Sequence, residues 1–428
     1  MSASYLLERA WVDGAVRDDV LVEIEDGRFT AVTPGGVGGT RLAGLTLPGL
    51  ANCHSHAFHR ALRGRTQRER GTFWTWREQM YAVAGRLTPD TYFELARATY
   101  REMVAAGMTS VGEFHYLHHQ PDGSPYADPN AMGHALIAAA AEAGIRIALL
   151  DTCYLSSGFG RPPEGAQVRY TDGDAGRWAE RVSAIDHDHV GAAIHSVRAV
   201  PKGQLGTVVE ATAGRPLHVH LSEQVAENDA CLATYGVTPT QLLHDVGALG
   251  PRTTAVHATH LIGADVTHLG TTQTRACFCP TTERDLGDGI GPGRALALAG
   301  AVLTLGSDSH AVIDPFEEMR ALELDERLAT QSRGHWTAAE LLAAGTAHES
   351  LGFDDAGTIA VGQRADLVTL STETTRTAGT GADEATAVFA ATAADVTHVV
   401  VDGRVAYTAG DDEEIGRELA AAIGKVHA

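Results

Sequence analysis

The sequence predicts an α/β fold: a TIM-type (β/α)8 barrel with a small β-sandwich domain built from both chain ends. The chain has 428 residues, which is long for an ordinary single domain. A barrel takes ~250 residues or more as one unit, so a barrel plus one small domain fits this length. The middle of the chain alternates short apolar strands with amphipathic helices, whereas both ends consist of short alternating runs.

Residues 1–47 and 359–428 are predicted to form the small domain together. The stretches LLERAWVDGAV, VLVEIEDGRFTAV and TRLAGLTLPG alternate apolar and polar residues around glycine-containing turns. Near the other end, GTIAVGQRADLVTL and VTHVVVDGRVAYTAG have the same pattern, and EEIGRELAAAIGKV predicts a terminal helix. We therefore expect the two ends to pair in space, with the rest of the chain inserted between them.

Residues 48–358 are predicted to form the barrel. In chain order, the candidate strands are LANCHSH, MTSVGEFHY, IRIALLDTCY, VGAAIHSV, PLHVHLSE, TAVHATH, RACFCP and AVLTLGSD. Helical segments such as TYFELARATYREMVAAG separate them. Strand and helix alternation at this spacing predicts a parallel sheet, and eight such units predict a closed barrel.

Charge and composition narrow the class of partner. With 33 Lys and Arg against 54 Asp and Glu, the formal net charge is −21, which disfavours nucleic acid and anionic membrane surfaces as partners. The sequence starts without a secretion signal, and no apolar run approaches the ~20 residues that a bilayer requires. Five scattered cysteines suggest reduced thiols. We expect a cytoplasmic enzyme that acts on a small molecule.

Reactive side chains stand at the ends of nearly all the candidate strands. They are His54 and His56, Glu113 and His115, His195, His220, His257 and Asp308. Active sites of such barrels lie at the C-terminal ends of the strands. The positions of these residues therefore predict one shared pocket.

Four of these residues predict a metal site. His54 and His56 are two apart on a strand, so both side chains lie on one face. Adding His220 and Asp308 gives three imidazoles and one carboxylate, a set that suits Zn²⁺ or Fe²⁺ and leaves room for water. An isolated HxH is more often incidental, so the prediction depends on the whole set. We expect one divalent metal per chain, with zinc as the first choice.

Three residues are predicted to carry the proton chemistry. Glu223 follows His220 by three residues, where the strand turns into a loop, and can take a proton from the attacking water and pass it to a leaving nitrogen. His257 can hold the attacking hydroxide and polarise the substrate. Asp308 is predicted to act both as a ligand and as a base. The alternatives are a solvated surface charge for Glu223 and a core histidine for His257.

The order of these motifs resembles the amidohydrolase superfamily. HxH, then H-x-x-E, then His, then Asp in GSDSH is similar to its deaminase branch with a single metal and no carboxylated lysine. Several longer stretches are similar to the formimidoylglutamate deiminase family of histidine degradation: LPGLANCHSHAFHRALRG, FWTWREQMY, VGEFHYLHH, IHSVRAV, HVHLSEQ, HATHL and CPTTERDLGDGIG. FWTWRE and IHSVRAV are the stretches that single out this family.

The resemblance implies a reaction and a substrate site. N-formimino-L-glutamate and water would give N-formyl-L-glutamate and ammonia, in a homodimeric enzyme. Arg77, Tyr116, His195 and Arg198 would surround the glutamate part, because each lies within a matching motif. Arginine binds carboxylates through two parallel hydrogen bonds, and Tyr and His add donors. His59 stands near the substrate where many members have Gln, and its imidazole can still donate one hydrogen bond.

Two other functions compete with this interpretation. Another mononuclear-metal deaminase of the branch, acting on guanine, cytosine or a related heterocycle, would need aromatic and amide groups to hold a ring. A metal-free structural module would lack some of the four ligands, and none is missing. The histidines of FHYLHH are interpreted as loop and packing residues, and Cys277 and Cys279 as strand residues of the seventh βα unit.

Overall fold

The computed structural model describes residues 2–68 and 70–428, and its larger part is a parallel eight-stranded sheet. Its strands pair in chain order from β5 to β12, and all their pairings are parallel. The strands are β5 (Leu50–Ser55), β6 (Met108–His115), β7 (Arg146–Cys153), β8 (Val190–Ile194), β9 (Leu217–Leu221), β10 (Thr253–His257), β11 (Arg275–Phe278) and β12 (Val302–Leu305). A parallel bridge between Ser55 and Asp308 joins the two ends of the sheet, which confirms the predicted barrel.

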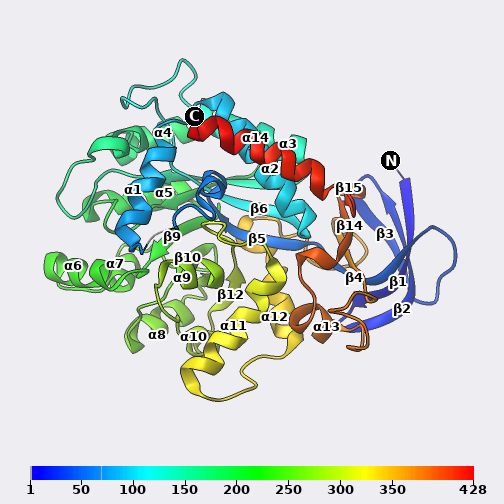
Figure 1. Cartoon of the computed structure of the whole chain (residues 1–428). Coiled ribbons are helices and arrows are strands. Elements are labelled where there is room, and N and C mark those ends of the chain that lie inside the picture. The colour runs from blue at the N-terminus through cyan, green and yellow to red at the C-terminus, as the bar shows by residue number, and fades with distance from the viewer. Residues whose placement is uncertain (1, 69) are drawn as a thin grey trace.

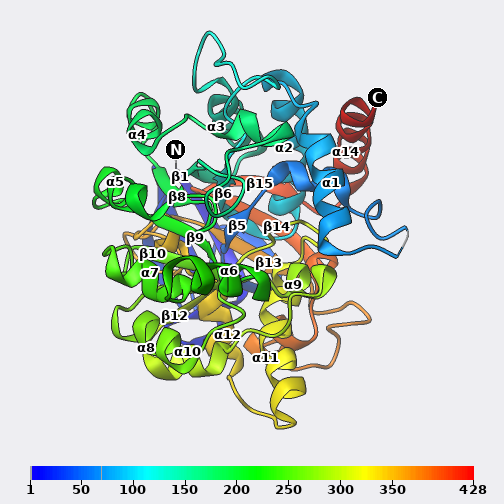
Figure 2. The same cartoon turned by 90° about the vertical axis from the view of Figure 1, so that its left-hand side faces the viewer.

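Helices surround these strands, as Figure 2 shows. They are α1 (Phe73–Ala84), α2 (Pro89–Ala105), α3 (Ala131–Ala143), α4 (Ala175–Ser183), α5 (Lys202–Thr212), α6 (Val225–Tyr235), α7 (Pro239–Asp245), α8 (Gly263–Thr271), α9 (Pro280–Leu286), α10 (Gly293–Ala299), α11 (Pro315–Thr330), α12 (Ala338–Gly345), α13 (Glu384–Phe389) and α14 (Asp412–His427). The described residues also include the 3₁₀ helices η1 (Ala57–Leu62), η2 (Gly165–Tyr170), η3 (His348–Leu351) and η4 (Ala393–Asp395).

Local sequence explains where several helices begin. Thr88, Thr238 and Asp314 each accept a hydrogen bond from the first turn of the helix that follows. In all three cases a proline occupies the start of the helix, where its missing N–H costs no hydrogen bond. Asp314 thus fixes the end of the loop that leaves β12, whereas Thr88 and Thr238 fix the turns between α1 and α2 and between α6 and α7.

The two chain ends form a separate mixed sheet, as Figure 1 shows at the N-terminal side of the molecule. Its strands are β1 (Ser2–Val12), β2 (Ala15–Glu25), β3 (Arg28–Thr33), β4 (Thr40–Pro48), β13 (Leu367–Leu370), β14 (Val396–Val401) and β15 (Arg404–Thr408). The antiparallel pairing of β4 with β13 joins the two ends, as predicted. All seven strands belong to one hydrogen-bonded order, β15-β14-β13-β4-β1-β2-β3. The domain limits at 47/48 and 358/359 stay predictions.

The last helix, α14, packs against the barrel helix α2, although it follows the last strand of the terminal sheet. Arg101 of α2 donates to Glu414 at 3.0 Å and to Glu418 at 2.6 Å. At the end of α14, His427 Nε2 lies 2.9 Å from the carbonyl oxygen of Ala61 in η1. The predicted terminal helix is therefore present, and it contacts the segment that follows β5.

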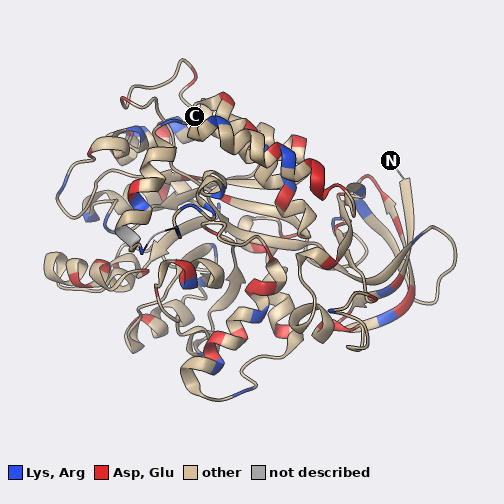
Figure 3. Cartoon of the chain, viewed as in Figure 1, with Lys and Arg blue, Asp and Glu red and all other residues tan. Residues whose placement is uncertain are grey.

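Acidic residues gather on outer helices such as α11 and α14 (Figure 3). Among the described residues, no helix combines the length and the apolar character needed to cross a membrane.

An ion pair joins the barrel to the terminal sheet. Arg146, which begins β7, donates to both carboxylate oxygens of Asp366, next to β13. Asp366 is buried and also accepts from the backbone N–H of Asp402 at 3.0 Å. Burial alone would raise the pKa of Asp366, but the Arg146 guanidinium outweighs burial and holds that pKa below its usual range.

Replacing Asp366 with Ala should lower the free energy of unfolding by about 3 kcal/mol, because it leaves the largely buried Arg146 guanidinium with only its 3.2 Å ion pair to Asp402. Urea unfolding at neutral pH measures this loss. Because the pKa of Asp366 is lowered in the folded state, its stabilisation is present at neutral pH and is lost as the pH falls through that lowered pKa. The matched control is Glu413→Ala, which removes an exposed pair with Arg417 and should change stability by less than about 1 kcal/mol. Equal effects of the two substitutions would contradict the prediction.

Candidate metal and active site

Histidine and aspartate side chains from four strands converge at the carboxyl end of the barrel. His54 on β5, His220 on β9, His257 on β10 and Asp308 after β12 each place one ligand atom within 4.8 Å of the others. His54 Nε2 lies 3.2 Å from Asp308 Oδ1 and 3.1 Å from His220 Nε2. His56 Nε2 lies 3.3 Å from the same Asp308 oxygen. The five residues therefore form one cluster of possible ligands.

The tautomer of His56 follows from its partner. Its Nδ1 lies 2.9 Å from the carbonyl oxygen of Phe114, which can only accept, so Nδ1 carries the proton. Burial lowers the pKa of His56, which keeps the ring neutral at neutral pH. The Nε2 lone pair therefore faces the Asp308 carboxylate.

This arrangement fits a cation. Burial alone would raise the pKa of Asp308, but its hydrogen bond to His54 and the nearby histidines hold it well below its usual range, so the carboxylate is charged. A lone pair and a carboxylate oxygen 3.3 Å apart repel each other unless positive charge lies between them. Imidazole nitrogens and a carboxylate are the donors that divalent zinc and iron prefer.

Closure of the barrel brings His54, His56 and Asp308 together. The carbonyl oxygen of His54 accepts the backbone N–H of Ser307 at 3.1 Å and that of Asp308 at 3.0 Å. The N–H of His56 donates to the carbonyl oxygen of Asp308 at 3.3 Å. A Cβ at Gly306 would lie only 2.7 Å from the Cβ of His54, so this approach requires glycine.

A series of buried hydrogen bonds supports this seam, the contact between β5 and the segment after β12. The amide nitrogen of Asn52 donates to Ser307 Oγ at 2.7 Å, and this oxygen lies 3.0 Å from His310 Nδ1. His310 Nε2 lies 3.2 Å from Ser55 Oγ, which donates to Glu113 at 2.7 Å. Because the Asn52 amide nitrogen can only donate, the consistent order assigns the ring proton of His310 to Nε2. These hydrogen bonds link β5, β6 and the segment after β12.

The backbone is strained at the ends of these strands. Ser222, His257, Ala258, Asp308 and His310 all have positive φ, a conformation that residues other than glycine seldom adopt. Such strain persists only where surrounding contacts fix it, and it gathers at functional sites. The five residues lie within or next to the cluster.

Acidic groups surround His257. Its Nε2 lies 3.9 Å from Asp308 Oδ2, and its Nδ1 lies 3.5 Å from Glu283. Burial alone would lower the pKa of His257, but Glu223, Glu283 and Asp308 together hold it well above its usual value. Burial raises the pKa of Glu223. The cluster thus has a proton-carrying side formed by His257 and its carboxylates.

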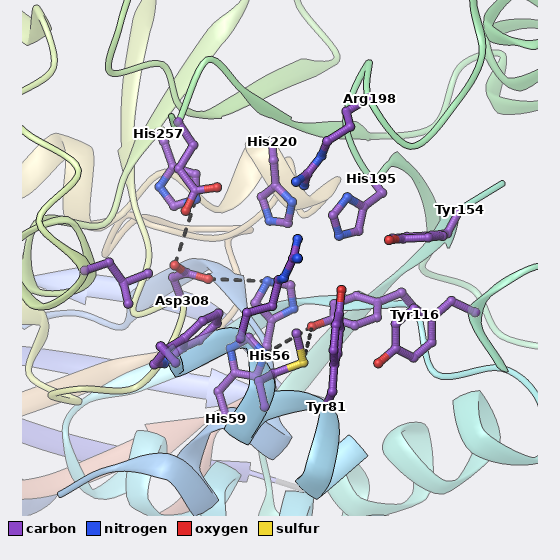
Figure 4. A pocket seen from close by; sticks show the side chains of 16 residues that line it. His56, His59, Tyr81, Tyr116, Tyr154, His195, Arg198, His220, His257 and Asp308 are labelled. Atoms are coloured by element: carbon purple, nitrogen blue, oxygen red, sulfur yellow. Dashed lines mark hydrogen bonds and ion pairs between the residues drawn. The ribbon is translucent and has the colours of Figure 1, made fainter. Parts of the chain in front are cut away.

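A cavity opens over the cluster (Figure 4). Ten of the predicted site residues line it: His56, His59, Arg77, Tyr116, His195, Arg198, His220, Glu223, His257 and Asp308. His54 lies beneath them, fully buried, and reaches the others through its Nε2. The structure therefore brings the predicted ligand, proton-transfer and substrate-binding residues to one place, whereas Glu113 and His115, which were expected in the same pocket, do not line it.

His59 contacts a second predicted residue of the cavity. Its Nε2 lies 3.1 Å from the hydroxyl of Tyr116, and its ring lies 4.6 Å from that of His56. An imidazole at this position thus forms a polar link between η1 and the end of β6.

Several lining residues were not predicted: Trp76, Met80, Tyr81, Tyr154, Tyr170 and Leu286. Two of them had a signal in the sequence. Tyr154 directly follows β7, where strand-end residues reach the pocket. Tyr81 lies four residues after Arg77 on α1, so the two share a helix face. Tyr170 ends η2 within an irregular segment, and no periodicity indicates its position.

The histidines of FHYLHH form a different cluster. His115, His118 and Asp151 place possible ligand atoms within 4.8 Å of one another. However, Arg181 donates to both oxygens of Asp151, at 3.0 Å and 2.8 Å, and Trp178 donates to one of them. The guanidinium already supplies the positive charge that this carboxylate needs, so the cluster fits a packing role. Cys277 lies in β11, Cys279 directly follows it, and both are buried free thiols.

Comparison with known proteins defines the class. A model of the Amidohydrolase family matches residues 45–406. The chain belongs to this family, and it is a metal-dependent hydrolase that acts on C–N bonds.

Among curated relatives, the formimidoylglutamate deiminase of Pseudomonas aeruginosa is 38% identical over 394 residues, covering 86% of each chain. The resemblance predicted from the motifs is thereby confirmed. The 8-oxoguanine deaminase of the same organism is 29% identical over 407 residues, covering 89% of this chain and 86% of that protein.

Solved structures share the fold. An amidohydrolase from Brucella melitensis superposes over all of both chains with a TM-score of 0.90 and 30% identity. An adenosine deaminase from Xanthomonas campestris with bound zinc has a TM-score of 0.83 and 21% identity, covering 99% of this chain and 98% of that one. At that identity the second likeness shows the fold alone.

Replacing Gly306 with Ala should disturb the seam between β5 and β12 and weaken metal binding. The added methyl would also lie 2.9 Å from the backbone nitrogen of His54, an overlap that costs about 1–3 kcal/mol. Zinc affinity, measured by competition with a chelator, and urea unfolding test this. Gly206→Ala on α5 is the control, because nothing lies within 4 Å of the added methyl there. Wild-type zinc affinity in the Gly306 variant would refute the prediction.

Proposed function

We propose that the enzyme hydrolyses N-formimino-L-glutamate to N-formyl-L-glutamate and ammonia, a step of histidine degradation. The observation that carries this proposal is the presence of two arginines, Arg77 and Arg198, in the same cavity as the histidine and aspartate cluster. A dicarboxylate with a reactive C–N bond at one end matches such a cavity. Similarity to formimidoylglutamate deiminase supports the same substrate.

We assign the metal to His54, His56, His220 and Asp308, with zinc as the expected ion and Fe²⁺ as the alternative. The first two histidines converge on Asp308 Oδ1, whereas His257 faces the other oxygen, Oδ2. This difference supports a ligand role for His54 and His56 and a catalytic role for His257. When bound, the ion supplies positive charge that acidifies water and polarises the substrate.

Glu223, His257 and Asp308 then handle the proton. Glu223 lines the cavity and has no hydrogen-bond partner among the described residues, so its carboxylate is available to the substrate. We propose that it accepts a proton from the attacking water and delivers it to the leaving nitrogen, which departs as ammonia. His257, held between Glu283 and Asp308, stabilises the attacking oxygen, and Asp308 assists in removing its proton.

Arg77, Arg198, Tyr116, His195 and His59 are proposed to bind the glutamate part. No carboxylate of the described chain lies within 4.0 Å of the Arg198 guanidinium, although most other arginines form ion pairs. Because the region is partly buried, its low dielectric would strengthen the interaction between a ligand carboxylate and this guanidinium. We also propose that the enzyme is a homodimer and lies in the cytoplasm.

The substrate is tested by measuring ammonia release from N-formimino-L-glutamate on zinc-loaded protein, with guanine and cytosine run in parallel. We expect turnover of formiminoglutamate alone. Turnover of a ring substrate would favour the alternative that the enzyme is a heterocycle deaminase, and it would contradict the proposed substrate.

Replacing Glu223 with Gln should preserve zinc content and lower kcat by about 10²–10⁴-fold, because the amide cannot carry the proton. Zinc content per chain and kcat are measured together. Glu210→Gln, on the exposed side of α5, controls for the loss of one acid. Full activity of the Glu223 variant would exclude the proton-transfer role.

A further inference from the structure

The side chain of Gln167 in η2 connects two tyrosines that line the cavity. Its Nε2 lies 3.0 Å from the hydroxyl of Tyr81 and 2.8 Å from that of Tyr154. Its Oε1 accepts the backbone N–H of Glu164 at 3.1 Å. Gln167 is buried, so these three hydrogen bonds hold its amide in one place.

The direction of these hydrogen bonds is determined by the Glu164 backbone. An N–H can only donate, so the amide oxygen of Gln167 faces Glu164 and the amide nitrogen faces the tyrosines. The amide nitrogen also only donates, so both tyrosine hydroxyls must accept. Each hydroxyl can therefore donate its own proton to another acceptor. No described residue places such an acceptor within hydrogen-bond distance of either hydroxyl.

These two hydroxyls lie beside the arginines. Tyr81 and Arg77 belong to one helix, with the guanidinium 5.6 Å from the ring centroid. The ring of Tyr154 lies 4.6 Å from that of His195, and His195 lies 5.1 Å from His220 of the cluster. Figure 4 shows Tyr81, Tyr154 and Arg198 on the side of the cavity away from Asp308. One end of the cavity thus offers two guanidinium groups and two hydroxyl protons.

The same end faces a second, outer hollow. This hollow is bordered by Arg77, Tyr81, Gln167 and Arg198. A ligand that places its reactive end at the histidine and aspartate cluster would therefore direct its other end toward these donors. Burial raises the pKa of Tyr154, so its hydroxyl remains a proton donor at neutral pH.

We propose that Gln167 is a positioning residue for substrate specificity, and that it turns the hydroxyls of Tyr81 and Tyr154 toward a carboxylate of the ligand. A carboxylate only accepts, and this wall presents protons for it to accept. The inference rests on the proposed function in one respect, namely that the substrate is acidic. It adds two tyrosines to the residues expected to bind that substrate and one glutamine that positions them.

Binding of glutarate, an unreactive dicarboxylate, to the zinc-loaded protein tests the proposal, with glutaramide as the neutral analogue. Calorimetry should show that Tyr81→Phe and Tyr154→Phe each weaken glutarate binding by about tenfold or more, because each removes a hydrogen bond to a charged group. Glutaramide, whose neutral amide oxygens accept weaker hydrogen bonds, should lose less affinity in the two variants than glutarate does.

Two substitutions at Gln167 separate positioning from packing. Gln167→Glu supplies an acceptor that draws both tyrosine protons away from the cavity, so glutarate binding should fall further than in either Phe variant. Gln167→Leu leaves the hydroxyls without a fixed direction and should give a smaller loss. Tyr407→Phe, in β15, removes a hydroxyl bonded to Asp412 at 3.1 Å and should leave glutarate binding unchanged.

Equal glutarate affinity in wild type, Tyr81→Phe, Tyr154→Phe and Gln167→Glu would overturn the proposal, as would failure of the zinc-loaded wild type to bind glutarate. Urea unfolding of each variant confirms that it is folded before its affinity is compared. Glutarate binding that depends on the tyrosines, without turnover of formiminoglutamate, would support this inference while contradicting the proposed function.

Discussion

The contact between β5 and the segment after β12 is the constraint on which the site depends. A single carbonyl oxygen, that of His54, receives the N–H groups of Ser307 and Asp308. The same contact closes the sheet and places two histidines of β5 opposite the carboxylate of Asp308. Because glycine at 306 permits this approach, the packing of the barrel and the geometry of the ligand cluster cannot be separated.

Strand ends carried most of the information that could be read from the sequence. His54 and His56 were predictable because alternation on a strand puts both on one face, and His220, His257 and Asp308 because each follows an apolar run. The residues that were missed lie elsewhere. Gln167 and Tyr170 belong to a short 3₁₀ helix in an irregular segment, where neither helical nor strand periodicity indicates which way a side chain points. Hydrogen bonds to Tyr81 and Tyr154, which belong to other segments, decide the role of Gln167, and no local pattern encodes these bonds.

The distribution of charge reconciles an acidic chain with an acidic ligand. The net charge of −21 would repel an anion at long range. Exposed acids lie on outer helices, however, where salt screens them within about 8–10 Å. Inside the cavity, Arg77 and Arg198 act over shorter distances and in a lower dielectric, so their local field prevails. Selectivity for an anion at close range is compatible with repulsion at long range.

The terminal sheet has a consequence for how the protein folds during its synthesis. Strands β1 to β4 leave the ribosome early, but their partner β13 belongs to the other end of the chain. The barrel seam is similarly delayed, since 255 residues separate Asn52 from Ser307. A growing chain thus carries the paired histidines of β5 before Asp308 is present to complete their donor set. Metal taken up during translation would meet an incomplete site, and full affinity would develop only as the last strands emerge.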